Sequence, residues 1–182
     1  GGGEGSVSFF GAEAVGRRIA YVIDMSGSMA SGGKIEAVQA EVGRSLSELR
    51  PPMEFFIGMY NSAGYPLVGF EGWTEANPAM TREARRAFAH RASELGGTTF
   101  PVYAFDLVFA LRPLPDAIFF MTDGDFSDQD TSTGRIIAMN AQHKIPIHCL
   151  TFIDRSAESR MRRIAEASGG TYTHVDGTRR RR

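Results

Sequence analysis

The sequence predicts an α/β fold in which a mostly parallel sheet is covered by helices on both faces. Three short apolar runs, at residues 19–23, 117–122 and 145–152, have the length and the β-branched and aromatic content of strands that are buried on both faces. Longer segments between them carry apolar residues at every third or fourth position, which is the pattern of amphipathic helices. Strands that alternate with helices in this way form parallel sheets.

The chain divides into a lead-in, one domain and a tail. Residues 1–17 are expected to be a flexible lead-in, in which residues 6–10 have strand character and should pair at an edge of the sheet. The alternative is that this segment packs across the open end of the core. Residues 18–176 form the domain, and residues 177–182 are expected to be a disordered basic tail.

The first half of the domain is expected to contain three strands and two helices. A strand at residues 18–24 is followed by a helix at 34–49, which two prolines end. The second strand, at 54–60, and the third, at 66–70, flank a short polar loop with a glycine, which favours a hairpin. We therefore expect the third strand to run antiparallel at the sheet edge, ahead of a helix at 81–95.

The second half continues the alternation of helices and strands. Helices are expected at residues 101–111, at residues 131–144, and after Ser156, which is the expected N-cap of the last helix. Strands are expected at residues 117–122, 145–152 and 171–175. A glycine pair separates the last helix from the last strand.

Composition describes a single domain with a mildly acidic body. The 182 residues can bury a sizeable core, and 42% hydrophobic with 23% charged residues is ordinary for a globular protein. The net charge is −1, but without the four arginines at 179–182 it is −5, because 16 basic residues face 21 acidic ones. Such a body argues against nucleic-acid binding. No apolar run approaches the roughly 20 residues of a membrane span and no signal peptide is recognisable, so we expect a soluble domain whose compartment the sequence does not indicate.

One strand runs directly into a group of oxygen donors. The run at residues 19–23 ends at Asp24, and Ser26, Gly27 and Ser28 follow at once. In an Asp-x-Ser-x-Ser segment, alternation can point the carboxylate and both hydroxyls to the same side of a loop, while glycine lets the backbone approach an ion. Hard oxygen donors suit Mg²⁺, Mn²⁺ or Ca²⁺ and suit zinc poorly. The alternative is a Ser/Gly-rich turn in which Asp24 caps the next helix.

Two further segments place oxygen donors after regular elements. A Gly-Gly loop carries Thr98 and Thr99 just ahead of a helix, and the strand at 117–122 ends at Asp123 in a Thr-Asp-Gly sequence. With these motifs, residues 18–175 resemble the von Willebrand factor type A (vWA) domain, whose metal-ion-dependent adhesion site (MIDAS) has the same three motifs in the same order. The metal ligands that this resemblance implies are Asp24, Ser26, Ser28, Thr98 and Asp123.

The resemblance also implies a fold and a cation. The fold is a Rossmann-like three-layer αβα sandwich with the strand order 3-2-1-4-5-6 and one antiparallel edge strand. This order would make the strands that end at Asp24 and Asp123 neighbours, and ligands of such sheets bind beyond the carboxyl ends of the strands at this point. The cation is expected to be Mg²⁺, with Mn²⁺ or Ca²⁺ as alternatives. Thr99 stays in reserve for Thr98, because the resemblance alone selects the first threonine.

The function implied by the resemblance is that of a metal-dependent protein-binding or adhesion module. Hydroxyl ligands are neutral, so an ion held by few carboxylates keeps positive character and leaves a position for an outside ligand. As in the family's integrin members, an Asp or Glu side chain of a partner protein would occupy that position. We expect a monomeric domain from a larger protein, without enzymatic activity and without nucleic acid as a partner. Specificity would come from the surrounding loops, at residues 29–33, 61–64, 72–79, 100 and 125–130.

Two other functions stay open as alternatives. One is a Mg²⁺- or Mn²⁺-assisted phosphohydrolase or another metal-dependent enzyme, for which Lys34 and Arg82 are the basic residues expected near the rim of the site. The other is an RNA-associated vWA protein, which the arginine tail alone supports. The partner itself and the larger protein are not indicated by the sequence.

Other metal and catalytic motifs are incomplete. The sequence from Asp123 begins like a calcium loop of the EF-hand type, but Asp128 stands where that loop needs glycine and Gly134 where it needs glutamate. The four histidines and the single cysteine lack the spacing of zinc ligands. No Gly-x-Ser-x-Gly or Walker sequence is present. Cys149 lies in an apolar run and is expected to be a buried thiol of low reactivity.

Overall fold

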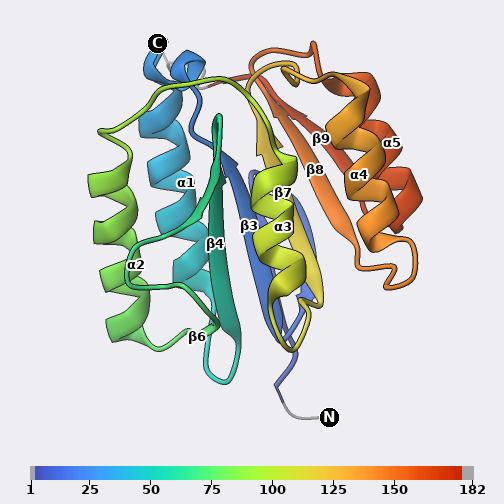
Figure 1. The fold of residues 1–182 in the computed structure, drawn as a ribbon. Coiled ribbons are helices and arrows are strands. Elements are labelled where there is room, and N and C mark those ends of the chain that lie inside the picture. The colour runs from blue at the N-terminus through green and yellow to red at the C-terminus, as the bar shows by residue number, and fades with distance from the viewer. Residues whose placement is uncertain (1–2, 178–182) are drawn as a thin grey trace.

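The computed structural model describes residues 3–177, and its centre is a seven-stranded sheet between two layers of helices (Figure 1). The predicted tail lies outside the described residues except for Gly177. The strands of this sheet are β3 (Arg18–Asp24), β4 (Glu54–Tyr60), β5 (Gly64–Pro66), β6 (Thr74–Glu75), β7 (Ala117–Thr122), β8 (Ile147–Phe152) and β9 (Tyr172–Val175). The helices are the short 3-10 helix η1 (Gly27–Ala30), α1 (Lys34–Glu48), α2 (Pro78–Arg91), α3 (Val102–Ala110), α4 (Asp130–Asn140) and α5 (Glu158–Ser168).

The sheet has the predicted topology. Its strands follow the order β5-β4-β3-β7-β8-β9, in which β3, β4, β7, β8 and β9 are parallel and β5 is an antiparallel edge strand. Helices α1 and α2 cover one face, and α3, α4 and α5 cover the other. The predicted α/β class, the strand order 3-2-1-4-5-6 and the antiparallel edge are therefore confirmed.

The edge strand begins earlier than predicted because the turn before it is tighter. Asn61 N donates to Ala63 O at 2.9 Å, and Ala63 N donates to Asn61 Oδ1 at 3.1 Å, so β5 starts directly at Gly64. Pro66, which has no N–H, is the last residue of β5 and not its first. Residues 67–70 form a turn that buries Leu67 and Phe70 instead of a strand.

The expected edge pairing of residues 6–10 is wrong. Strand β1 (Gly5–Phe9) pairs with β2 (Ala12–Gly16) in a separate antiparallel hairpin, so residues 5–16 are not a flexible lead-in. Both turn residues have positive φ, 47° at Phe10 and 83° at Gly11, as two-residue hairpin turns of type I′ require. The alternative prediction, in which residues 6–10 pack across the open end of the core, agrees better with the structure.

The hairpin covers part of the sheet face that carries only two helices. Phe9 is fully buried, and its ring contacts the rings of Tyr21 in β3 and Phe119 in β7 at centroid distances of 5.5 and 5.6 Å. Glu48 and Glu41 on α1 accept hydrogen bonds from the backbone N–H groups of Ser8, at 2.7 Å, and Phe10, at 2.6 Å. The hairpin thus takes the place of a third helix on this face.

Four helices begin at residues other than the predicted ones: α3 and α4 each differ by one residue, and α2 and α5 differ at their caps. Helix α2 starts three residues early because Asn77 Oδ1 accepts a hydrogen bond from Met80 N at 2.9 Å and Pro78 occupies the first turn. The N-cap of α5 is Ala157 and not Ser156, whose N–H donates to Asp154 Oδ1 at 2.6 Å instead. Within the described residues, no helix is both long enough and apolar enough to cross a membrane.

Candidate metal site

Two carboxylates lie side by side where two central strands end. The parallel register pairs Ile23 of β3 with Met121 of β7, so the next residues of the two strands emerge together at the carboxyl edge of the sheet. Asp24 is fully buried there, and Asp123 is only 2% exposed. Adjacent buried carboxylates repel one another, so this edge of the sheet favours a nearby positive charge.

Both oxygens of Asp24 accept hydrogen bonds. Oδ1 accepts from Ser26 N at 2.9 Å and Oδ2 accepts from the hydroxyl of Thr122 at 2.9 Å. Burial and, second, the charge of Asp123 raise the pKa of Asp24 to about 6. The bond to Ser26 N agrees with the alternative of a capped turn, but the bond to Thr122 ties the carboxylate across to β7 as well.

The two serines extend the group of oxygen atoms from Asp24 to Asp123. The hydroxyl oxygens of Ser26 and Ser28 lie 3.1 Å apart, and Ser28 Oγ donates to Asp123 Oδ1 at 2.8 Å. Ser26 is buried and Ser28 is exposed, so the group reaches from the sheet edge to the surface. The structure therefore brings four of the five predicted ligands together, and their role as metal ligands stays a prediction.

Thr98 lies on the neighbouring loop with its hydroxyl turned elsewhere. Its Oγ1 hydrogen-bonds to Ser62 Oγ at 2.8 Å, and its backbone N–H donates to the same oxygen at 3.0 Å. The loop itself touches the site, because Gly27 N donates to Gly97 O at 3.1 Å. Thr99 is held by Ser127, whose Oγ accepts from Thr99 N at 2.9 Å.

Lys34, which was expected near the rim of the site, contributes a positive charge to it. Its Nζ donates to Asp123 Oδ2 at 2.8 Å, and its side chain is 14% exposed. Lys34 is the first residue of α1 and belongs to none of the three motifs, so the sequence did not indicate its ion pair with Asp123. Thr122 and Ser62, which hold Asp24 and Thr98, were also missed, although Thr122 is the threonine of the Thr-Asp-Gly motif.

Arg82 and the loop at residues 72–79 lie away from the site. Arg82 was expected near the rim, but it lines a groove between α1 and α2 that continues past Leu49, at the opposite end of α1 from Lys34. Residues 72–79 also lie at the far end of the sheet, because β6 pairs with the start of β4. In the loop after β7, Asp125 pairs with Arg160 at 2.6 Å, and this agrees with the rejection of a calcium loop.

The donor atoms suit a hard divalent cation. Two carboxylates and the hydroxyls of Ser26 and Ser28 supply oxygen alone, with neither nitrogen nor sulfur among them. Among residues 3–177, no three His, Cys, Asp or Glu side chains lie together in a way that could hold a metal ion. A cation at this edge would therefore need the serine hydroxyl oxygens in addition to the two carboxylates. The Asp-x-Ser-x-Ser and Thr-Asp-Gly motifs together provide both kinds of oxygen.

Comparison with known proteins agrees with this fold. A structure of a von Willebrand factor type A protein from Catenulispora acidiphila has a TM-score of 0.78 and 18% identity, over 96% of this chain and 42% of that one. BatB, a conserved hypothetical protein from Bacteroides thetaiotaomicron, has a TM-score of 0.69 and 16% identity, over 90% and 92%. The ArnB paralog VWA2 from Sulfolobus acidocaldarius has a TM-score of 0.61 and 15% identity, over 95% and 50%.

These similarities show the fold, and this chain spans less than half of the Catenulispora protein structure. No match was found among curated proteins. The family model of the von Willebrand factor type A domain matches residues 17–174. Since this match covers most of the chain and all five α-helices, the chain belongs to the von Willebrand factor type A domain family.

Proposed function

We propose that this domain binds a partner protein through a divalent cation, Mg²⁺ in the simplest case, at the carboxyl ends of β3 and β7. The observation that carries the proposal is the pair of buried carboxylates, Asp24 and Asp123, which are linked through the backbone N–H and hydroxyl of Ser26 and the hydroxyl of Ser28. Lys34 is the one cation within ion-pair distance of either carboxylate in the described part of the chain. The pair therefore retains a negative charge that a divalent cation would balance.

Each residue has a distinct part in this proposal. Asp24 is oriented by Ser26 N and Thr122, and Asp123 is oriented by Ser28 and Lys34. The serine hydroxyls add oxygen donors without adding charge. Thr98 would become a further ligand if its hydroxyl broke the hydrogen bond to Ser62 and turned to the cation. A bound cation would supply a position that accepts a carboxylate oxygen of the partner protein, and a charge-assisted contact of this kind is stronger than a neutral one.

Two neighbouring aromatic side chains beside the Thr98 loop are suited to contact the partner. The rings of Phe100 and Tyr103 lie 5.9 Å apart, and Tyr103 is 41% exposed. Exposed aromatic residues of this kind often supply much of the binding energy of protein interfaces. Tyr103→Ala is expected to weaken partner binding without changing metal binding, because its side chain is not among the proposed ligands.

Metal binding is tested by calorimetric titration of the whole chain with Mg²⁺ and Mn²⁺. We expect binding to wild type and little or none to Asp123→Ala, which removes a ligand without removing core packing. Asp106→Ala is the matched control, because Asp106 is an exposed aspartate that only pairs with Arg135 at 3.4 Å. Equal binding by wild type and Asp123→Ala would refute the site, and weakened binding by Asp106→Ala would point to a general effect of charge.

The second experiment separates a binding module from an enzyme. Partner capture by the immobilised domain should occur in Mg²⁺, cease in EDTA and fail with Asp123→Ala, and replacing one Asp or Glu of the captured protein should abolish it. The purified domain is also incubated with generic phosphomonoesters and phosphodiesters in Mg²⁺ or Mn²⁺. Hydrolysis above background that disappears in Asp123→Ala would overturn the binding function in favour of metal-assisted hydrolysis.

A further inference from the structure

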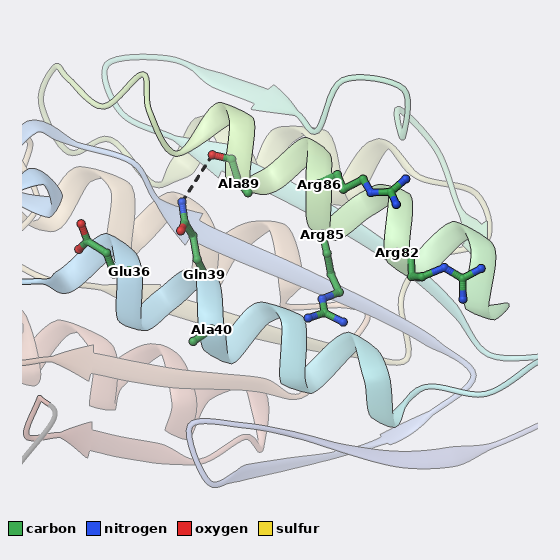
Figure 2. Close-up of a pocket in the computed structure, with 7 residues that line it drawn as sticks. All are labelled: Glu36, Gln39, Ala40, Arg82, Arg85, Arg86 and Ala89. Carbon is green, nitrogen blue, oxygen red and sulfur yellow. Dashed lines mark hydrogen bonds between the residues drawn. The ribbon is translucent and has the colours of Figure 1, made fainter. Parts of the chain in front are cut away.

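A long groove separates α1 and α2 on the outside of the domain. Its first part, a hollow of about 570 Å³, has Gln39 and Ala40 on one wall and Arg82, Arg85 and Ala89 on the other (Figure 2). Arg82 and Arg85 also line a second hollow of about 510 Å³, which continues the groove toward the end of α1. The two hollows thus form one continuous surface, and arginines line its full length.

Arginines without an acidic partner are concentrated in this groove. Of the arginines at residues 3–177, ten pair with a carboxylate within 4.0 Å, and the four that do not are Arg50, Arg82, Arg85 and Arg112. The first three of these line the groove, whereas Arg112 lies elsewhere. The pattern is notable because the described body of the protein is mildly acidic and pairs most of its arginines.

Three of the four arginines of α2 line the groove. Arg82 lies three residues before Arg85 and four before Arg86, so the three form a row on one side of the helix. In Figure 2 the side chain of Arg85 is directed toward α1, whereas those of Arg82 and Arg86 extend away from it. Arg86 pairs with Glu83 at 2.7 Å, but both side chains are mostly exposed, and such a pair is weak. Among the residues that line the first hollow, Glu36 is the one acidic side chain.

A glycine on α1 makes room for the central arginine. A Cβ atom at Gly43 would lie 2.9 Å from Arg85 Nε, so the guanidinium group rests against the bare backbone of α1. Gly43 is buried, and it faces α2. A glycine inside a helix destabilises it relative to alanine, so this position favours the placement of Arg85 over the stability of α1.

We propose that the groove between α1 and α2 binds an acidic helical segment of a partner protein. Guanidinium groups bind carboxylates through two parallel hydrogen bonds, and glutamates spaced three and four residues apart match the row on α2. The small residues Ala40 and Ala89 leave space between the walls for the apolar side chains of such a helix. Nucleic acid fits less well, because Glu36 and Glu83 lie beside the groove and the body of the domain is acidic.

This interaction would not require the metal site. The groove is lined by the outer sides of α1 and α2, and none of Asp24, Ser26, Ser28, Thr98 and Asp123 lines it. All measurements are therefore made in EDTA. Failure of the metal-dependent function would leave the groove untouched, and the reverse also holds.

The test measures fluorescence anisotropy of labelled peptide probes with the whole chain at low salt. One probe is a helix-forming peptide of about 15 residues with glutamates three and four residues apart along one face and leucine and alanine on the other. Its counterpart has glutamine in place of glutamate. We expect the glutamate peptide to bind, the glutamine peptide to bind at least several-fold more weakly, and raised salt to weaken binding.

Variants assign the binding to the groove. The double variant Arg82→Gln/Arg85→Gln should bind the glutamate peptide about tenfold more weakly, since each exposed ion pair contributes up to about 1 kcal/mol. Arg112→Gln is the control, because it removes an unpaired arginine outside the groove. Gly43→Ala changes no charge but should also weaken binding, because the added methyl group displaces Arg85.

Three results would overturn the proposal. The first is no binding of the glutamate peptide by wild type, and the second is an equal loss in Arg112→Gln and in the double variant, which would indicate attraction to positive charge anywhere on the surface. The third is tighter binding of a labelled single-stranded oligouridylate than of the glutamate peptide, with the same loss in the double variant. That result would assign the groove to RNA.

Discussion

Replacing Asp24 with asparagine should stabilise the metal-free protein at neutral pH. The pKa of Asp24 is raised from 3.8 to about 6, first by burial and second by the charge of Asp123. In the unfolded chain the carboxyl ionises at its ordinary pKa. Folding at pH 7.5 therefore buries an ionised carboxylate at a position that favours the neutral form. At about 1.4 kcal/mol per pKa unit, this destabilises the folded state by about 3 kcal/mol.

The sign of the pH dependence follows from the direction of the shift. Below pH 3.8 the carboxyl is protonated in both states, so Asp24 has no electrostatic cost there. Stability is lost as the pH rises from 3.8 through about 6, and the loss is complete above that range. The advantage of asparagine should therefore be about 3 kcal/mol at pH 7.5 and less than about 1 kcal/mol at pH 4.

Asparagine can preserve the two main hydrogen bonds of Asp24. Its Oδ1 can accept from Ser26 N, and its amide group can donate to the hydroxyl oxygen of Thr122. The Thr122 hydroxyl can in turn donate to Gly124 O, which lies 2.8 Å away. The substitution therefore removes the charge and keeps the volume and these two hydrogen bonds, and it loses the long bond that Asp123 N donates to Asp24 Oδ2 at 3.4 Å.

The assay is urea unfolding of both proteins in EDTA at pH 7.5 and pH 4, with Asp106→Asn as an exposed control. In Mg²⁺ the bound cation should stabilise the wild type but not the variant. The difference in unfolding free energy between the two proteins should then become smaller or change sign. A variant less stable than wild type at pH 7.5 in EDTA would show that the bonds to the ionised carboxylate outweigh the cost of burial. If Asp24→Asn were more stable than wild type by the same amount at pH 7.5 and pH 4, the removed charge could not be the cause.

Three other predictions concern the fold. Because two buried clusters fill both sides of the sheet without a metal, EDTA should lower the melting temperature only modestly, and calorimetry that finds no cooperative transition in EDTA would contradict this. Cys149 is fully buried and burial raises the pKa of its thiol, so a thiol reagent should label the native protein slowly, and rapid labelling without denaturant would be incompatible with this placement. Phe9→Ala should lower the free energy of unfolding by about 3–5 kcal/mol, because Phe9 is fully buried between the hairpin and the sheet; an effect below about 1 kcal/mol in urea unfolding would mean that the hairpin is not part of the cooperative fold.

The central sheet was predictable because its strands are buried on both faces. Such strands are continuous apolar runs bounded by polar residues, and residues 117–122 were therefore assigned to β7 without error at either end. The amphipathic helices were predicted for a similar reason, since one apolar stripe defines each of them. Errors occurred where a boundary depends on one side chain, as at Asn77, whose cap starts α2.

The N-terminal hairpin could not be assigned from local pattern. Its second strand, Ala12–Gly16, contains two alanines and a glutamate, which have low strand propensity. Its turn uses Phe10 at positive φ, where asparagine or glycine would have been the usual signal. The hairpin is stabilised by tertiary contacts on a sheet face with two helices, and the sequence of the segment does not contain that information.

In the candidate site, too, some features follow from local sequence and others depend on residues that are distant in the chain. Strand adjacency and the spacing within Asp-x-Ser-x-Ser suffice to bring Asp24, Ser26, Ser28 and Asp123 together. The orientation of Thr98 depends on Ser62, which lies on a different loop and 36 residues away in the chain. Lys34 reaches Asp123 across 89 residues, and a single lysine at the start of a helix has no motif to mark it.

Lys34 gives the proposed function a sharp dependence on metal. Asp24 and Asp123, when ionised, and Lys34 together carry one net negative charge, so without a cation the site would repel an acidic side chain. A divalent cation would reverse the sign to one net positive charge. Partner capture through an Asp or Glu should therefore be absent without metal and should not merely be weakened. The groove between α1 and α2 is positively charged with or without metal, so binding that survives EDTA would belong to the groove and binding that is lost would belong to the site.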